Sequence, residues 1–177
     1  ELAADKIGEL IVTSQSRELV GLFFGMQNLK KNPEREKAKP ITKIGILGAG
    51  FMGSGIADVS ANSGFDVRLK DRDFETIANC KKAVWRGLSR KVHKRVIKPF
   101  QRDLVMTRIT GQTDFSGFEN TDLVIESVFE ELELKRRVLA EIEMVIRDNC
   151  IFASNTSAIP IGEIGSKAKH PERLIGM

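Results

Sequence analysis

The feature that most constrains the fold of this chain is a glycine-rich turn, Gly48-Ala-Gly-Phe-Met-Gly53, which fits the pattern G-x-G-x-x-G. The apolar run KIGIL precedes the turn and a segment with small residues follows it, so the turn connects a predicted strand to a predicted helix. Gly48 permits the tight turn, Gly50 lets the backbone approach a pyrophosphate, and Gly53 lets helix and strand pack closely. The free N–H groups at the start of the helix favour phosphate. The pattern therefore predicts a dinucleotide-binding turn.

A carboxylate completes this fingerprint. Asp71 follows the second predicted strand, about 20 positions beyond the turn, where the pattern places an acidic residue. Its carboxylate can accept hydrogen bonds from the hydroxyls of the adenosine ribose and would repel a 2′-phosphate, which favours NAD over NADP. Arg72 beside it is a mild counterweight to this preference for NAD. The alternative is a glycine turn that binds nothing, with Asp71 capping a strand end, and the combined strand–turn–helix context disfavours it.

Strands and helices alternate along most of the chain. The predicted strands cover residues 43–47, 66–70, 105–110, 122–126 and 150–153, and a sixth begins at residue 174. The predicted helices cover residues 51–63, 74–98 and 132–147, the second with a break near Gly87. Alternation of this kind predicts an α/β fold, a doubly wound parallel sheet of the Rossmann kind with helices on both faces.

The first part of the chain has a different pattern. Residues 1–31 carry apolar side chains at helical spacing, and the polar, charged stretch 30–40 holds two prolines, which is typical of a linker. We therefore expect a helical linker over residues 1–40 and a dinucleotide-binding domain over residues 41–177. Because the chain begins with no initiator Met and no targeting pattern, we expect it to be part of a longer protein.

Charge and cysteine usage narrow the choice of ligand. The formal net charge is +4 and the sequence pI is about 9.1, a mild basic excess that suits a phosphate-bearing ligand. The chain has no aromatic-rich basic segment that would stack bases, so we expect no nucleic-acid partner. Cys80 and Cys150 are far apart and lack the spacing of metal ligands, so we expect free thiols and no metal site. No apolar stretch approaches the roughly 20 residues of a membrane span.

Three further segments carry a family resemblance: residues 122–130 (DLVIESVFE), 151–157 (IFASNTS) and 173–177 (RLIGM). Together with the glycine turn they resemble the NAD-binding domain of the 3-hydroxyacyl-CoA dehydrogenases, and the S-N-T-S segment is highly specific to that family. Residues 1–40 resemble the segment that follows an enoyl-CoA hydratase domain in multifunctional fatty-acid oxidation α subunits. The segments FQRD and GQTDFSGFE are closer to the mitochondrial trifunctional type than to the bacterial type.

The resemblance implies NAD-dependent oxidation of 3-hydroxyacyl-CoA to 3-oxoacyl-CoA in fatty-acid β-oxidation. It implies that Glu130 is catalytic through pairing with a histidine directly after the I-G-M segment, and that Ser157 contacts the substrate hydroxyl. Lys94 joins Ser157 in binding the acyl-CoA substrate by the same resemblance. The implied cofactor contacts are Gly48, Gly50, Phe51, Met52, Gly53, Asp71, Val128, Phe129, Glu130, Lys135 and Ser157.

Each of these residues has a plainer alternative. Glu130 would suit a solvated helix start, and Ser157 belongs to a composition common in loops. The resemblance favours function for both, and so does the position of Ser157 just after a strand, where ligands bind in such folds. His93 and His170 match no catalytic position and are predicted to be surface residues. The basic residues of the segment 74–98 usually form a solvated face, although the resemblance places acyl-CoA phosphates near them.

The resemblance also implies a setting for the protein. It implies a thiolase β subunit as partner, membrane association only through that complex, and the mitochondrial matrix as compartment, with the bacterial cytoplasm as the alternative. Two other functions stay open. One is a module that binds NAD without turnover, which we expect of these 177 residues by themselves. The other is a Rossmann dehydrogenase that acts on a small hydroxy acid.

Overall fold

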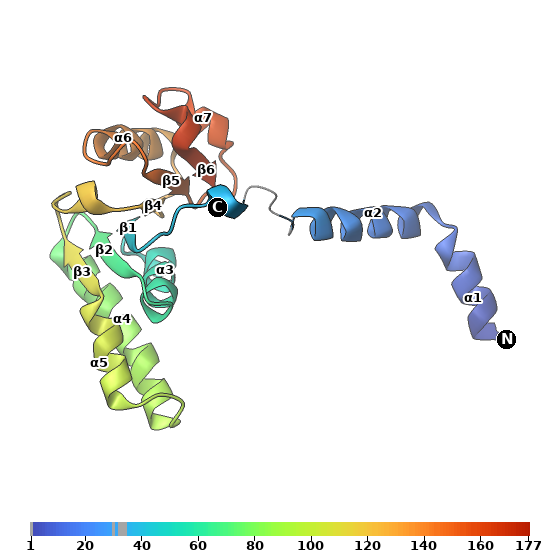
Figure 1. Cartoon of the computed structure of the whole chain (residues 1–177), viewed down its shortest axis with the longest axis horizontal. Coiled ribbons are helices and arrows are strands. Elements are labelled where there is room, and N and C mark those ends of the chain that lie inside the picture. The colour runs from blue at the N-terminus through green and yellow to red at the C-terminus, as the bar shows by residue number, and fades with distance from the viewer. Residues whose placement is uncertain (1, 30, 32–34) are drawn as a thin grey trace. The chain divides into compact units, whose positions relative to one another are not determined.

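The computed structural model describes residues 2–29, 31 and 35–177, and the chain divides into two compact units, Glu1–Pro40 and Ile41–Met177. Residues 30 and 32–34 of the predicted linker lie outside the described residues. No helix in the described ranges is long and apolar enough to cross a membrane. The first unit contains the helices α1 (Leu2–Ile11) and α2 (Ser14–Leu29) and the short 3-10 helix η1 (Arg35–Lys37) (Figure 1).

The second unit is built on a six-stranded parallel sheet in the order β3-β2-β1-β4-β5-β6. The strand order reverses between β1 and β4, which is the doubly wound arrangement of a Rossmann fold and confirms the predicted fold class. The strands are β1 (Lys43–Leu47), β2 (Asp66–Lys70), β3 (Ile109–Gln112), β4 (Leu123–Glu126), β5 (Ile151–Ser154) and β6 (Leu174–Gly176).

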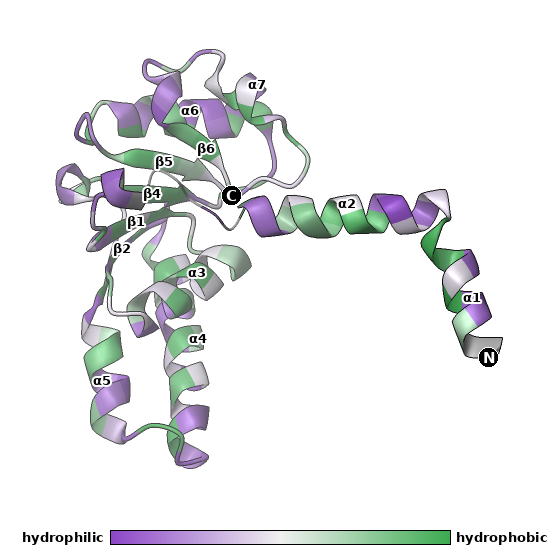
Figure 2. Ribbon diagram, turned by 45° about the vertical axis from the view of Figure 1, so that its right-hand side comes forward, coloured by the Kyte–Doolittle hydropathy of each residue, from purple (hydrophilic) through white to green (hydrophobic). Residues whose placement is uncertain are grey.

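Helices cover both faces of this sheet (Figure 1). One face carries α3 (Phe51–Asn62), α4 (Phe74–His93) and α5 (Pro99–Thr107), and the other carries α6 (Leu132–Glu143) and α7 (Ile161–Gly165), with the short 3-10 helices η2 (Phe118–Asn120) and η3 (Pro171–Arg173) in the loops. The central strands are therefore buried on both sides, which explains their near-continuous apolar sequences (Figure 2).

The structure corrects the prediction for the third strand. Val105 and Met106, predicted to open that strand, belong to α5, and β3 follows the helix. Pro99 occupies the first helical turn, and the Gln101 side chain accepts a hydrogen bond from the Lys98 backbone N–H at 2.8 Å, so local capping starts a helix here. Val105 and Met106 then pack against the core on the α3 side. A short apolar run fits strand and helix equally well, which is why its pattern misled the prediction.

The helix predicted over residues 74–98 is also corrected. It continues unbroken past Gly87, because Val84 and Leu88 on either side of that glycine are buried in the core. It ends at His93 rather than at residue 98. The chain then turns through Arg95, whose φ of 55° is left-handed, and returns along α5. The two helices form a hairpin that projects from the sheet (Figure 1).

The glycines of the turn meet very different surroundings. Gly48 has a φ of +102°, and its N–H donates to the Lys70 carbonyl at 2.8 Å. A Cβ atom on Gly53 would lie 1.8 Å from the Gly48 carbonyl oxygen, so only glycine lets α3 pack this closely on the end of β1. A Cβ atom on Gly50 would meet nothing within 4 Å. The fold therefore requires Gly53, whereas Gly50 faces open space.

We expect Gly53→Ala to lower the free energy of unfolding by about 3 kcal/mol or to prevent folding, because the added methyl group overlaps backbone that cannot move aside. Gly50→Ala is the matched control and should change stability by no more than about 1 kcal/mol. Urea denaturation followed by circular dichroism measures both. Equal stability of the two variants would contradict this account of the turn.

Candidate functional site

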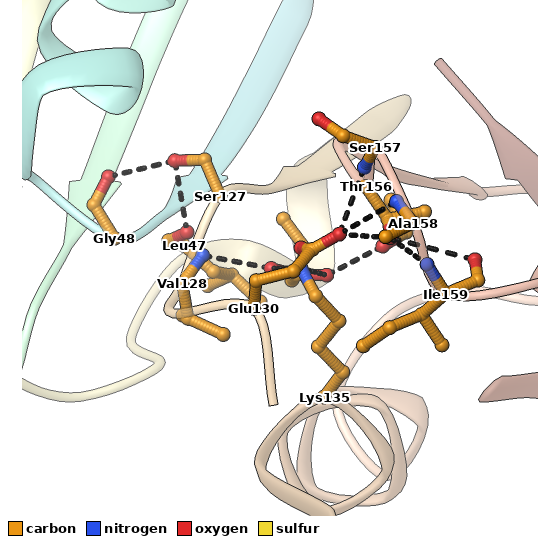
Figure 3. Close-up of polar contacts among 12 residues, drawn as sticks. Leu47, Gly48, Ser127, Val128, Glu130, Lys135, Thr156, Ser157, Ala158 and Ile159 are labelled. Atoms are coloured by element: carbon orange, nitrogen blue, oxygen red, sulfur yellow. Dashed lines mark hydrogen bonds and ion pairs between the residues drawn. The ribbon is translucent and has the colours of Figure 1, made fainter. Parts of the chain in front are cut away.

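The loops after β1 and β4 meet at the point where the strand order reverses. The Ser127 N–H donates to the Leu47 carbonyl at 2.8 Å. The Ser127 hydroxyl donates to the Gly48 carbonyl at 3.2 Å (Figure 3). These bonds join the glycine turn to the loop that leads into α6. Ligands of open α/β sheets bind in the crevice at such a reversal, outside the carboxyl ends of the strands.

A cavity of about 440 Å³ opens at this crevice. The predicted cofactor residues that line it are Gly48, Gly50, Phe51, Met52, Asp71, Val128 and Phe129. Gly53 lies under the turn and packs against it, and the remaining predicted residues, Glu130, Lys135 and Ser157, are not part of the cavity wall. Phe115, which was not predicted, closes one side and holds the Lys70 ammonium 4.4 Å from the centre of its ring.

Asp71 is held against the glycine turn. One carboxylate oxygen, Oδ2, accepts a hydrogen bond from the Ala49 N–H, and Oδ1 accepts one from the Arg72 N–H, both at 2.7 Å. Each oxygen keeps a second lone pair for a ribose hydroxyl. The Arg72 guanidinium lies 3.9 Å from the Asp73 carboxylate and is largely exposed, so it does not neutralise Asp71 directly. The geometry suits a ribose that carries two free hydroxyls.

The residues at the crevice fit a dinucleotide. Open space at Gly50 leaves room for a pyrophosphate against the backbone, and the first turn of α3 starts there with N–H groups that have no partner within the helix. The Asp71 carboxylate lies on the β2 side, where the prediction places adenosine, and the cavity continues past the reversal to Val128 and Phe129. With adenosine at Asp71, the other half of a dinucleotide would lie on the β4 side of the crevice.

Glu130 joins the loops that follow β4 and β5. Its Oε1 atom accepts hydrogen bonds from the Thr156 hydroxyl at 2.6 Å and from the N–H groups of Ser157 and Ala158 at 2.8 and 3.1 Å. Its Oε2 atom lies 3.2 Å from the Lys135 ammonium. The Thr156 hydroxyl, with the Ala158 and Ser157 N–H groups and Lys135, lowers the pKa of Glu130 to about 2 against a smaller opposing effect of desolvation. The carboxylate is therefore ionised at neutral pH, with three donors on Oε1 and the Lys135 ammonium beside Oε2.

The structure places Lys135 differently from the expected cofactor contact. Its side chain is fully buried, and Nζ binds the two oxygens of Glu126 at 2.9 and 3.1 Å as well as Glu130. It reaches the crevice only through Glu130, because no part of it is exposed. Glu126, Ser154 and Thr156 were not predicted as members of this network. The signal for Glu126 was present in the sequence: a charged residue closes an otherwise apolar strand.

Ser157 and Lys94 lie on different parts of the domain. Ser157 is exposed, its N–H binds Glu130, and its hydroxyl is turned away from the Glu130 network (Figure 3). Lys94 follows α4 at the tip of the helical hairpin and is exposed. Within the described part of the chain, no contact joins Lys94 to the other predicted site residues. The substrate-binding and catalytic roles of both residues stay predictions.

The fold and the crevice define a dinucleotide-binding domain of the Rossmann class. A family model described as "3-hydroxyacyl-CoA dehydrogenase, NAD binding domain" matches residues 43–177. The chain belongs to this family, and its cofactor is NAD. The resemblance inferred from the sequence motifs is thereby confirmed at the level of the family.

Solved structures of several dehydrogenases are similar to this domain. FadB2 of M. tuberculosis is 34% identical with a TM-score of 0.75, and the match covers 78% of this chain and 49% of that one. The (S)-3-hydroxybutyryl-CoA dehydrogenase PaaH1 of Ralstonia eutropha is 33% identical, with the same TM-score of 0.75 and the same coverage of 78% and 49%. The dehydrogenase part of multifunctional enzyme 1 from C. elegans is 27% identical, with a TM-score of 0.68 and coverage of 78% and 31%. The chain thus spans about half the length of the first two relatives.

The position of Asp71 predicts a strong preference for NADH over NADPH. Asp71→Ala should weaken NADH binding by about tenfold or more, because it removes charge-assisted hydrogen bonds to the ribose, and should reduce the discrimination against NADPH. Asp66→Ala, at the opposite end of the same strand, is the matched control and should bind NADH normally. Fluorescence titration measures the affinities. Equal affinities of the unchanged chain for both dinucleotides would exclude Asp71 as the ribose ligand.

The low pKa of Glu130 predicts a pH-dependent contribution to stability. The pKa falls from 4.5 to about 2 in the folded chain, so the stabilisation is complete above pH 4.5 and disappears as the pH falls towards 2. The Tm difference between the wild-type chain and Glu130→Gln should therefore be constant at neutral pH and shrink in this acidic window. Glu141→Gln, an exposed carboxylate nearby in the sequence, serves as control. A Tm difference that does not change down to pH 2 would refute the prediction.

Proposed function

We propose that the protein containing this domain oxidises 3-hydroxyacyl-CoA to 3-oxoacyl-CoA with NAD. The observation that carries the proposal is a second, larger hollow of about 1030 Å³ that adjoins the dinucleotide crevice and shares Gly50, Phe51 and Met52 with it. One of the similar structures is that of a 3-hydroxybutyryl-CoA dehydrogenase, which supports the substrate class. When bound, NAD accepts the hydride that leaves carbon 3 of the substrate.

The chemistry of this second hollow suits an acyl-CoA. It runs along α3 and α4 and is lined mainly by apolar side chains such as Val59 and Val84, with Arg90 at its wall. An apolar chain can bury itself there while its phosphates remain near positive charge. The basic residues of α4 and the turn that follows are Arg86, Arg90, Lys91, Lys94, Arg95 and Lys98.

The loops after β4 and β5, beside the crevice, carry Glu130 and Ser157, which differ in the chemistry they can supply. The Ser157 hydroxyl, turned away from Glu130, is available to hold the substrate hydroxyl by a hydrogen bond (Figure 3). Glu130 is a weak base for an alcohol proton, because its pKa is about 2. Neither His93 nor His170 contacts Glu130 among the described residues, and the His170 ring instead binds Glu172. The general base we propose is the histidine that the resemblance places directly after the I-G-M segment, since its pKa lies near working pH.

The same proposal assigns the domain to a multifunctional fatty-acid oxidation α subunit. In this setting a hydratase domain precedes the helical unit of residues 1–40, and a thiolase β subunit is the partner, in the mitochondrial matrix or the bacterial cytoplasm. Support comes from the likeness of those residues to the connecting segment of such proteins and from the similar multifunctional enzyme of C. elegans. Mass spectrometry of the full-length protein purified with its partners tests this assignment.

We expect the 177-residue chain to bind NADH without measurable turnover, and the full-length protein to oxidise 3-hydroxybutyryl-CoA or a longer homologue. Among the described residues neither histidine contacts Ser157 or Glu130, and loss of a general base removes about 10²–10⁴ in rate. In the full-length protein, Ser157→Ala should lower kcat/KM by about tenfold or more, whereas Ser63→Ala, an exposed control, should leave it unchanged. Absorbance of NADH follows the reaction. Full activity of the 177-residue chain would overturn the assignment of the base.

A further inference from the structure

A fully buried carboxylate lies behind the crevice without touching it. Glu126, the last residue of β4, has no exposed surface. Its Oε1 atom accepts hydrogen bonds from the Val128 N–H at 2.7 Å and from the Lys135 ammonium at 2.9 Å. Its Oε2 atom accepts from the Ser154 hydroxyl at 2.6 Å and contacts the same ammonium at 3.1 Å. A carboxylate buried this deeply persists only because every lone pair direction finds a donor.

The first consequence of this arrangement is a fixed ammonium group. Lys135 comes from α6, its side chain is fully buried, and Nζ has three protons to donate. Contacts to both oxygens of Glu126 hold Nζ in place, and a third contact reaches Oε2 of Glu130 at 3.2 Å (Figure 3). The position of the half-exposed Glu130 carboxylate is thus set from inside the protein.

The second consequence is a fixed loop. The hydrogen bond from Val128 to Glu126 orders the backbone directly after β4, and Val128 is part of the crevice wall. The bond from Ser154 brings β5 into the same network, and Glu130 extends it to the N–H groups of Ser157 and Ala158. One buried carboxylate therefore organises both loops on the β4 side of the site.

Stability alone gives little reason for such a pair. Replacing a buried ion pair with well-packed apolar residues of similar volume is often neutral or stabilising, because both charges lose their hydration on burial. Apart from Ser154, which bonds to Glu126, the other buried side chains of β4 and its neighbour β5, such as Val124 and Phe152, are apolar. The burial of two charged side chains, Glu126 and Lys135, is therefore better explained by a role at the neighbouring crevice than by stability.

We propose that Glu126 is a positioning residue for the nicotinamide half of the bound dinucleotide. It acts through the Lys135 ammonium, which contacts Glu130, and through the Val128 backbone, which it holds on the β4 side of the crevice. The adenosine half, on the β2 side, depends instead on Asp71 and the glycine turn. The inference rests on NAD binding, a property of the family, and is independent of the acyl-CoA substrate.

The experiment compares two ligands on the 177-residue chain. NADH reports on both halves of the site, and ADP reports on the adenosine half alone. We expect Glu126→Gln, and the double variant Glu126→Met with Lys135→Met, to weaken NADH binding by at least about tenfold, the scale of one lost hydrogen bond to a charged group, while ADP binding stays within about twofold. Isothermal titration calorimetry measures both affinities, and thermal unfolding measures the Tm of each variant.

The double variant keeps the test decisive if Glu126→Gln fails to fold, because it leaves no unpaired buried charge. Thr121→Val is the matched control, since it also removes a buried polar group that neighbours β4, one bonded to the Phe118 carbonyl, yet lies outside the network. It should lower the Tm without changing either affinity. Wild-type NADH affinity in the double variant would overturn the proposal. An equal loss of NADH and ADP affinity would overturn it too, because it would assign the pair to the fold as a whole.

Discussion

The close contact between α3 and the end of β1 is the constraint on which the rest of the site depends. Gly53 sits directly against the Gly48 carbonyl, where a single added carbon would overlap the backbone. This contact sets the start of α3 beside the turn. The Gly48 carbonyl of the turn also accepts a hydrogen bond from Ser127 in the loop after β4. The crevice at the reversal of strand order exists because these two backbone segments approach so closely.

The two sides of the crevice hold their carboxylates in different ways. On the β2 side, Asp71 is held by backbone N–H groups close to it in space and remains partly accessible, so it can bind a ligand directly. On the β4 side, the accessible carboxylate of Glu130 is supported by charges that are wholly buried. The position of Asp71 depends only on the glycine turn, whereas the position of Glu130 depends on the packing of β4, β5 and α6.

The two adjoining hollows connect this construction to the proposed reaction. Gly50, Phe51 and Met52 line both hollows, so the proposed substrate hollow lies directly beside the dinucleotide crevice. The Phe51 side chain is 93% exposed and that of Phe129 is 78% exposed. Apolar side chains this open at the rim of a site are suited to contact with a ligand or a further domain.

The sequence by itself determined the glycine turn, the position of Asp71 beside it and the alternating fold, because each depends on local spacing that the backbone geometry dictates. The family motifs likewise located Glu130 and Ser157, which the structure brings together through the Ser157 N–H. Only the tertiary structure decided that Lys135 is buried and bound to Glu126, since that contact requires α6 to pack on β4. It also decided that Val105 belongs to a helix, because a short apolar run acquires its conformation from the core it packs against.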